Sequence, residues 1–323
     1  MSEGSAPSRQ IVLPDPFLRS AREKTLYASF SGGPDSTALV LLLAGSGLPF
    51  QAVHFTHGIR DDETGRREWM FCRSFCEERG IPVQRRELDV PAARRTGEGL
   101  EAAARRCRLD AWRELTGGED SAAVITAHHA DDVCENLLLR LFRGGNVSSL
   151  TALRPESLVN GIRFLRPLLA YSKRELKDFL IRNGISGWAE DATNAEDAAA
   201  RNFIRNRLLP LVGERLPFAP GGIRASSFAL ADDASFLEDA AASAARGDLT
   251  DAAYWKTLHP AVRIRVMRVF LSEAAGCSVI PDRRLMERFG FLLDQPATRR
   301  KRKMPVSGTS LSLVRTGNRI GLE

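Results

Sequence analysis

The chain has 323 residues, of which 43% are hydrophobic, and a formal net charge of +6. This length exceeds one typical domain and predicts two, and the absence of any apolar run of about eighteen residues predicts no membrane span. The pI of about 9.3 and the excess of arginine over lysine favour a polyanionic partner. A solvated, arginine-rich surface would give the same balance, so charge alone does not identify nucleic acid.

The N-terminal segment lacks the basic-then-apolar layout of a secretory signal, and we expect residues 1–19 to be a disordered leader. The five cysteines are an odd number without a CxxC pair. That pattern is typical of reduced thiols in a cytoplasmic protein, and it disfavours a disulfide framework or a zinc site.

The segment from Thr25 to Ala44 predicts a strand, a glycine turn and a helix. Two glycines permit tight backbone geometry, and Pro34 suits the first helical position. A strand, a glycine loop and a helix N-terminus together form an anion cradle, because free N–H groups and the helix dipole converge there. The spacing and lysine of a Walker A loop are both missing. The predicted cradle consists of Ser31, Gly32, Gly33, Pro34, Asp35 and Ser36.

Strands and helices alternate after the cradle. The hydrophobic pattern predicts strands at Pro49–His54, Ile81–Leu88 and Ser121–Ala127. Helices are predicted at Asp61–Arg79 and Leu100–Leu115, between these strands. The crossover lengths suit a doubly wound, mostly parallel sheet.

The same domain continues with a helix at Val133–Phe142, a strand at Ile162–Leu169 and a capped helix at Ser172–Asn183. We place it at residues 20–220. A proline- and glycine-rich stretch then marks a boundary, and residues 221–323 predict a smaller, mainly helical domain ending in a β-hairpin. The basic run at residues 299–303 fits either an RNA-phosphate contact or a solvated turn.

Polar residues gather where predicted strands end. His54 and His57 follow the second strand, and the sequence HHADD at residues 128–132 follows the fourth. Open parallel sheets place ligands at these carboxyl ends, so Asp131 and Asp132 could bind an ammonium group while a histidine moves a proton. Helix capping and a core histidine would explain the same residues, and a metal cluster is a further alternative.

Two helices carry clustered arginines. Arg105 and Arg108 share one face of the 100–115 helix, with Glu101 placed to form an i,i+4 ion pair. Arg201 and Arg205 project from a later helix start, a pattern fit for phosphate.

Four stretches together resemble one family: SGGPDS (31–36), HFTHGIR (54–60), AHHADDVCENLLLRLFRG (127–144), and RPLL (166–169) with EDATNAEDAAARNFIRNRLLP (190–210). They are similar to tRNA(Ile)-lysidine synthetases, members of the N-type ATP pyrophosphatase group. The resemblance implies the PP-loop fold, like that of the adenine nucleotide alpha hydrolases.

The resemblance also implies a reaction. The C2 oxygen of the wobble cytidine of a tRNA(Ile) with the anticodon CAU is adenylylated by ATP. The ε-amine of free L-lysine then attacks C2 and displaces AMP, giving lysidine and diphosphate. The oligomeric state stays open, a homodimer included.

Site roles follow from the resemblance. The cradle residues would hold ATP, with Asp35 as a ligand of Mg²⁺. Catalysis would fall to Asp35, His129, Asp131, Asp132 and Arg205. The substrate-binding residues would be His57, Arg105, Arg108, Asp132, Arg201 and Asn202. Thr56 stands where the family usually has asparagine, and the loop at 144–155 is less glycine-rich than usual.

Three other functions compete with this one. A tRNA thiolation enzyme of the same group would be expected to carry a CxxC pair, whereas Cys72 and Cys76 are spaced CxxxC. An amidotransferase-linked synthetase would need a glutaminase region. A non-catalytic basic RNA-binding module stays open.

Overall fold

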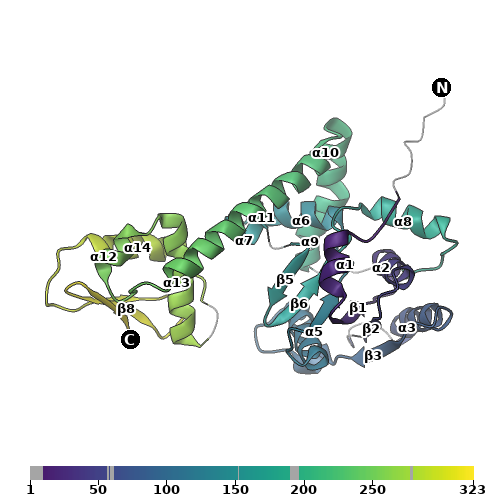
Figure 1. The fold of residues 1–323 in the computed structure, drawn as a ribbon, viewed down its shortest axis with the longest axis horizontal. Helices are drawn as coiled ribbons and strands as arrows, with labels where there is room; N and C mark the ends of the chain where they lie inside the picture. Colours follow the sequence, from purple (N-terminus) through teal and green to yellow (C-terminus); the bar gives the residue numbers. More distant parts are fainter. Residues whose placement is uncertain (1–9, 57, 59–61, 152, 190–195, 277–278) are drawn as a thin grey trace. The chain divides into compact units, whose positions relative to one another are not determined.

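The computed structural model describes residues 10–56, 58, 62–151, 153–189, 196–276 and 279–323. Two compact units divide the chain, residues 1–228 and 229–323, and Figure 1 shows the secondary structure of each. In the described part, no helix is both long enough and apolar enough to cross a bilayer.

The first unit is built on a six-stranded sheet with strand order β3-β2-β1-β4-β6-β5. Its pairs are parallel except for β5 with β6, which is antiparallel. The prediction of a doubly wound, mostly parallel sheet is confirmed. The strands are β1 (Thr25–Ser29), β2 (Gln51–Thr56), β3 (Val83–Glu87), β4 (Ala122–Ile125), β5 (Glu156–Val159) and β6 (Ile162–Leu165).

Helices cover both faces of this sheet because β1 and β4 point alternate side chains to opposite sides. Leu26, Ala28 and Ile125 pack with helices α1, α2, α3 and α8, whereas Val124 packs with Trp112 of α5. The helices of this unit are α1 (Asp15–Ala21), α2 (Pro34–Gly45), α3 (Asp62–Glu77), α4 (Val90–Ala93), α5 (Leu100–Thr116), α6 (Ala130–Phe142), α7 (Val147–Leu150), α8 (Lys173–Arg182), α9 (Glu196–Phe203), the π-helical turn η1 (Ile204–Leu208) and α10 (Leu209–Arg215). Helix α11 (Ala219–Ala244) runs across the division between the units.

The expected leader is corrected for residues 10–19. Ile11, Leu13 and Phe17 are buried in the main core, and helix α1 begins at Asp15. The Tyr171 hydroxyl accepts a hydrogen bond from the Val12 amide and donates one to the Val12 carbonyl, at 3.1 and 2.9 Å. Apolar burial and these two bonds order a segment whose composition alone indicated a leader.

The second unit packs helices α12 (Ala252–Thr257), α13 (Pro260–Ala275) and α14 (Arg283–Asp294) against a three-stranded antiparallel sheet. Trp255 is fully buried, with its ring edge-on to Phe270 and Phe289. The predicted hairpin is confirmed as β8 (Ser312–Thr316) and β9 (Arg319–Leu322). Strand β7 (Arg302–Pro305) adds to β8 and takes up the end of the basic run.

Candidate active site

The switch point of the sheet lies between β1 and β4. The chain moves outward from β1 to β2 and β3, and then returns to the other side of β1 to form β4. Ligands of open parallel sheets bind at the carboxyl ends of the strands beside such a point. The predicted cradle follows β1 and the HHADD sequence follows β4, so both lie at this position.

The cradle has the backbone that its glycines predicted. Gly32 has a φ of +85°, and a Cβ atom there would lie 3.2 Å from the Cys72 sulfur, so the position requires glycine. Ser31 and Ser36 hold the turn together, with 3.0 Å between their hydroxyl oxygens. Gly33 is the extended N-cap of α2, followed by Pro34 in its first turn.

His54 fixes the residue that follows β1, just before the cradle. Its ring Nδ1–H donates to the Phe30 carbonyl at 2.9 Å, and the side chain is 1% exposed. Burial lowers the pKa of His54 and keeps the ring neutral. His54 therefore supports the loop from inside the protein.

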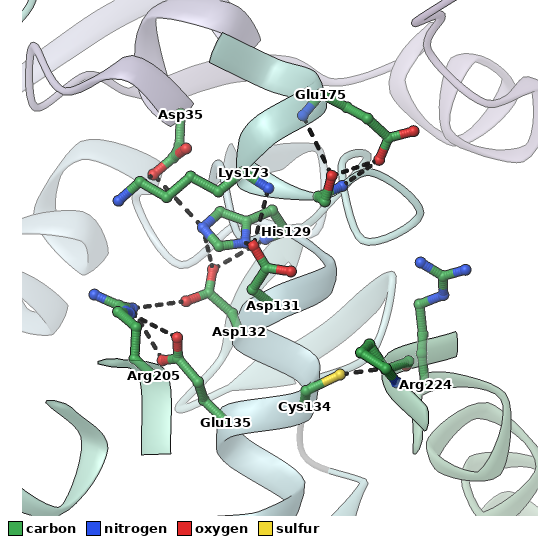
Figure 2. A network of polar contacts seen from close by, with 12 residues as sticks. Asp35, His129, Asp131, Asp132, Cys134, Glu135, Lys173, Glu175, Arg205 and Arg224 are labelled. Atoms are coloured by element: carbon green, nitrogen blue, oxygen red, sulfur yellow. Dashed lines mark hydrogen bonds and ion pairs between the residues drawn. The ribbon is translucent and has the colours of Figure 1, made fainter. Parts of the chain in front are cut away.

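His129 joins the cradle to helix α6. Its Nε2 lies 3.6 Å from Asp35 Oδ2 and 3.5 Å from Asp132 Oδ2, and its Nδ1 lies 3.8 Å from Asp131 Oδ2. Figure 2 shows the imidazole among these three carboxylates. The structure thus brings together four of the residues predicted to be catalytic.

The carboxylates set the charge of this histidine. Burial would lower the pKa of His129, but the hydrogen bond with Asp35 and the charges of Asp132, Asp35 and Asp131 outweigh it, and the pKa is raised. For Asp35, burial acts to raise the pKa, but His129, Lys173 and Arg205 together lower it. His129 and Asp35 therefore each stabilise the charged form of the other.

Asp131 and Asp132 also organise the backbone. The Asp132 carboxylate accepts the His129 amide at 3.0 Å, closing the first turn of α6. The Asp131 carboxylate accepts the Lys173 amide at 3.0 Å and so caps α8. This contact places the Lys173 ammonium 3.8 Å from Asp35 Oδ2.

Glu135 and Arg205 form the lower part of the site in Figure 2. Glu135 is fully buried, and its two carboxylate oxygens accept N–H bonds from Arg205 at 2.6 and 2.9 Å. Arg205 also lies 3.6 Å from Asp132, and Arg201 lies 3.7 Å from Glu135. These bonds raise the pKa of Arg205 and hold it as a cation. Arg205 lies in the π-helical turn η1, a distortion often found at functional sites.

Mg²⁺ fits the donor set that the site offers. Asp35 Oδ1 is buried without a hydrogen-bond partner in the described part of the chain. No group of three or more histidine, cysteine, aspartate or glutamate side chains there could hold a metal ion by itself. Mg²⁺ is commonly bound by one or two carboxylates together with substrate phosphates, and Asp35 beside a phosphate cradle meets that requirement.

The remaining predicted substrate residues lie around this cluster. Arg105 and Arg108 are exposed on α5, and no ion pair joins Arg105 to Glu101 among the described residues. Arg201 and Asn202 are half-buried on α9, next to η1. His57 lies outside the described residues, as do residues 190–195 of the last motif.

Glu135 and Lys173 were not identified from the sequence. A glutamate inside the otherwise apolar run VCENLLL was the available signal for Glu135, because a buried carboxylate requires a partner. Lys173 follows the serine that caps α8. Its position therefore indicated a helix start, and the sequence did not indicate its contact with Asp35.

These features define a doubly wound α/β domain with a glycine loop at its switch point, a geometry suited to phosphate groups and without a Walker A lysine. The chain belongs to the family of the PP-loop domain, whose model matches residues 9–212. The predicted resemblance to tRNA(Ile)-lysidine synthases is confirmed.

Two curated relatives illustrate the similarity. The chain is 32% identical over 264 residues to the tRNA(Ile)-lysidine synthase of Shigella flexneri, covering 80% of this chain and 57% of that protein. It is 35% identical over 248 residues to the same enzyme of Salmonella newport (strain SL254), covering 75% and 54%. The chain therefore spans about half the length of the curated relatives it matches.

A solved structure shares the fold. The U34-tRNA thiolase NcsA from Methanococcus maripaludis, determined with its [4Fe-4S] cluster, superimposes with a TM-score of 0.52. The match has 15% sequence identity and covers 67% of this chain and 78% of the thiolase. At that identity the likeness concerns the fold alone.

Proposed function

We propose that this protein ligates lysine to C2 of the wobble cytidine of a tRNA(Ile) with the anticodon CAU, using ATP. The observation that carries the proposal is the continuous chain of contacts Asp35–His129–Asp132–Arg205, which joins the phosphate cradle to helix α6 and to η1. Similarity to lysidine synthases over three quarters or more of the chain supports it.

In the first step, the C2 oxygen of cytidine attacks the α-phosphorus of ATP and diphosphate leaves. Backbone N–H groups at the start of α2, the hydroxyls of Ser31 and Ser36 and the Lys173 ammonium would hold the departing diphosphate. Mg²⁺ on Asp35 would neutralise phosphate charge when bound. Arg205 is held as a cation and would stabilise charge on the transferred adenylyl group.

In the second step, the ε-amine of lysine attacks C2, AMP leaves with the former C2 oxygen, and the amine loses a proton. Asp131 and Asp132 present the carboxylates that an ammonium group would meet. When protonated, His129 would act as a charge partner of Asp35 and the phosphates, a form that its raised pKa favours.

Two domains would share the substrates. We propose that residues 20–220 bind ATP and lysine and perform the chemistry, and that residues 221–323 contact the tRNA. The basic residues 299–303 are the phosphate contact predicted for the second domain.

The chemistry of Cys72 and Cys76 disfavours their use in thiolation. Cys72 and Cys76 are fully buried on α3, and burial raises the pKa of Cys76 to about 12 and that of Cys72 higher still. Thiols with such values are poor nucleophiles. Cys277 lies outside the described residues.

The experiment measures the release of AMP and diphosphate from ATP, with and without lysine, in the presence of a tRNA(Ile) with the anticodon CAU. We expect radiolabelled lysine to enter the tRNA, and Asp35→Ala to abolish incorporation. Arg73→Gln, on the outer surface of α3, is the matched control and should retain full activity. Absence of lysine incorporation by the wild-type chain, or incorporation by Asp35→Ala at the wild-type rate, would overturn the proposal.

A further inference from the structure

Arg166 lies at a strand end beside the catalytic cluster. The Thr126 amide donates to the Leu165 carbonyl at 3.0 Å, so the carboxyl ends of β4 and β6 are adjacent. His128 follows one end and Arg166 the other. The His128 ring is fixed by a 2.8 Å hydrogen bond between its Nδ1 and the Thr126 hydroxyl.

The Arg166 side chain is only 8% exposed. Its Nη1 donates to the Arg154 carbonyl and to the Ser157 hydroxyl, both at 2.9 Å. Its Nε is buried without a hydrogen-bond partner in the described part of the chain. A buried guanidinium ordinarily has a carboxylate or another anion as its counterion, and here the described residues supply none.

Other arginines approach the same edge of the sheet. Helix α5 leads directly into β4 and packs against β4 and β6, so it runs antiparallel to them. Its N-terminal half, with Arg105 and Arg108, therefore lies toward the carboxyl ends of the strands. Arg140 of α6 bonds to Asn136 at 2.9 Å, and the Nε of Arg201 also lacks a hydrogen bond. We call these residues the arginine cluster: Arg105, Arg108, Arg140, Arg166 and Arg201.

The positive charges of the cluster act on one another. Burial and then the charge of Arg105 lower the pKa of Arg166 to about 10. Burial, Arg105 and Arg201 lower the pKa of Arg140. Among the described residues, ion pairing in the cluster is confined to Arg201, which lies 3.7 Å from the already paired Glu135. Mutual repulsion of these guanidinium groups raises the free energy of the unliganded protein, and a bound anion would offset that repulsion.

We propose that the arginine cluster binds the backbone phosphates of the RNA on either side of the base that reacts. The inference rests on the proposed function and adds Arg140 and Arg166 to the substrate contacts. A guanidinium forms paired hydrogen bonds to phosphate oxygens, and several guanidinium groups match consecutive phosphates better than they match a single carboxylate of free lysine.

The phosphates of ATP have a separate location. The charges that act on Asp35 come from His129, Lys173 and Arg205, whereas those that act on His128 include Arg166 and Arg201. His129 contacts Asp35 beside the cradle, whereas His128 bonds to Thr126 at the end of β4, next to the end of β6 that carries Arg166. This separation leaves the cluster for the RNA.

The test measures binding of an anticodon stem-loop RNA with CAU, without catalysis. Arg105→Gln and Arg140→Gln should each weaken binding about three- to tenfold and reduce the slope of log affinity against log salt by about 1. Binding of a non-hydrolysable ATP analogue should stay unchanged. Arg166→Lys keeps the charge but loses the fork geometry, so it should weaken RNA binding while a thermal melt shows that it is folded.

The RNA supplies the second half of the test. A stem-loop with neutral methylphosphonates at the phosphates flanking the wobble cytidine should bind wild-type protein less tightly, and Arg105→Gln should then cause little further loss. Arg73→Gln is the control for charge alone and should leave all these values unchanged. Equal losses by Arg105→Gln on both RNAs, or weakened ATP-analogue binding with RNA binding intact, would overturn the inference. Because no step requires lysine ligation, failure of the proposed reaction is distinguishable from failure of RNA binding by the arginine cluster.

Discussion

Glu135 is a fully buried carboxylate paired with Arg205, which keeps 39% of its side chain exposed. Replacing Glu135 with Gln removes one charge of the pair and leaves a buried amide against a guanidinium. We expect the free energy of unfolding to fall by about 2–3 kcal/mol, because breaking a buried pair costs more than an exposed one. Urea denaturation measures this loss.

A double-mutant cycle separates the pair from its surroundings. Arg205→Met combined with Glu135→Gln should cost less than the sum of the single changes. Glu214→Gln on α10, an exposed glutamate, should stay within about 0.5 kcal/mol of wild type. Additive costs would show that the two residues contribute independently.

His128 predicts a pH dependence of stability. Burial lowers its pKa from 6.5 to about 4, with Arg166 and Arg201 contributing. The folded ring stays neutral while the unfolded ring binds a proton, so stability is present above pH 6.5 and is lost as the pH falls toward 4. That shift corresponds to about 3 kcal/mol.

The difference between wild type and His128→Gln isolates this contribution, because other groups titrate in both proteins. Unfolding free energies from pH 7 to pH 4 should converge as the pH falls, with the variant less sensitive to acid. A constant difference across that range would contradict the assigned cause.

At the scale of elements, the cradle depends on two properties of Gly32. Its backbone has a positive φ, and the Cys72 sulfur lies close to the place where a Cβ atom would be. Gly32→Ala should destabilise the protein by about 1–2 kcal/mol and weaken ATP binding, because φ at this position is positive and the new methyl group approaches the Cys72 sulfur. Thermal unfolding and nucleotide titration would measure both effects.

A second substitution separates the backbone strain at Gly32 from the steric contact with Cys72. Cys72→Ala removes the contact but not the backbone strain, so Gly32→Ala with Cys72→Ala should recover only part of the loss. Gly45→Ala at the end of α2, where a Cβ atom meets nothing within 4 Å, is the control and should be neutral or stabilising. Full recovery by the double variant would show that sterics alone operate.

Most of the sheet was predictable from the sequence because its strands are apolar and its helices amphipathic. Strand β5 was not, since ESLV is short, half-exposed and held by pairing with β6 and by the salt bridge between Glu156 and Arg163. Helix α1 is stabilised by the burial of Phe17 against residues that are far away in the sequence. The local composition does not reveal these contacts. Residues near one another in a motif, such as Asp131 and Asp132, were found. The capping of α8 by Asp131 joins residues 42 positions apart and has no local signal.

At the scale of the whole molecule, the positive net charge predicts salt-sensitive binding to RNA. Affinity for a full-length tRNA should fall tenfold or more between about 50 and 200 mM salt, through release of counterions from several phosphates. Fluorescence anisotropy over that range measures the slope.

Residues 299–303 provide a test within that measurement. Arg299→Gln with Arg300→Gln should reduce the slope by about 2 if both guanidinium groups contact phosphate. Lys301 is a weaker choice because it pairs with Glu323. An unchanged slope would identify the run as a solvated turn.

The outer position of β3 has a consequence for solubility. One side of this strand pairs with β2, and no strand among the described residues pairs with its other side. An unpaired edge can recruit a strand from another molecule, and charged side chains are a common defence. Arg85, Arg86 and Glu87 are all exposed there. The charged side chains on this edge therefore favour a chain that stays dispersed at high concentration instead of extending its sheet into fibrils.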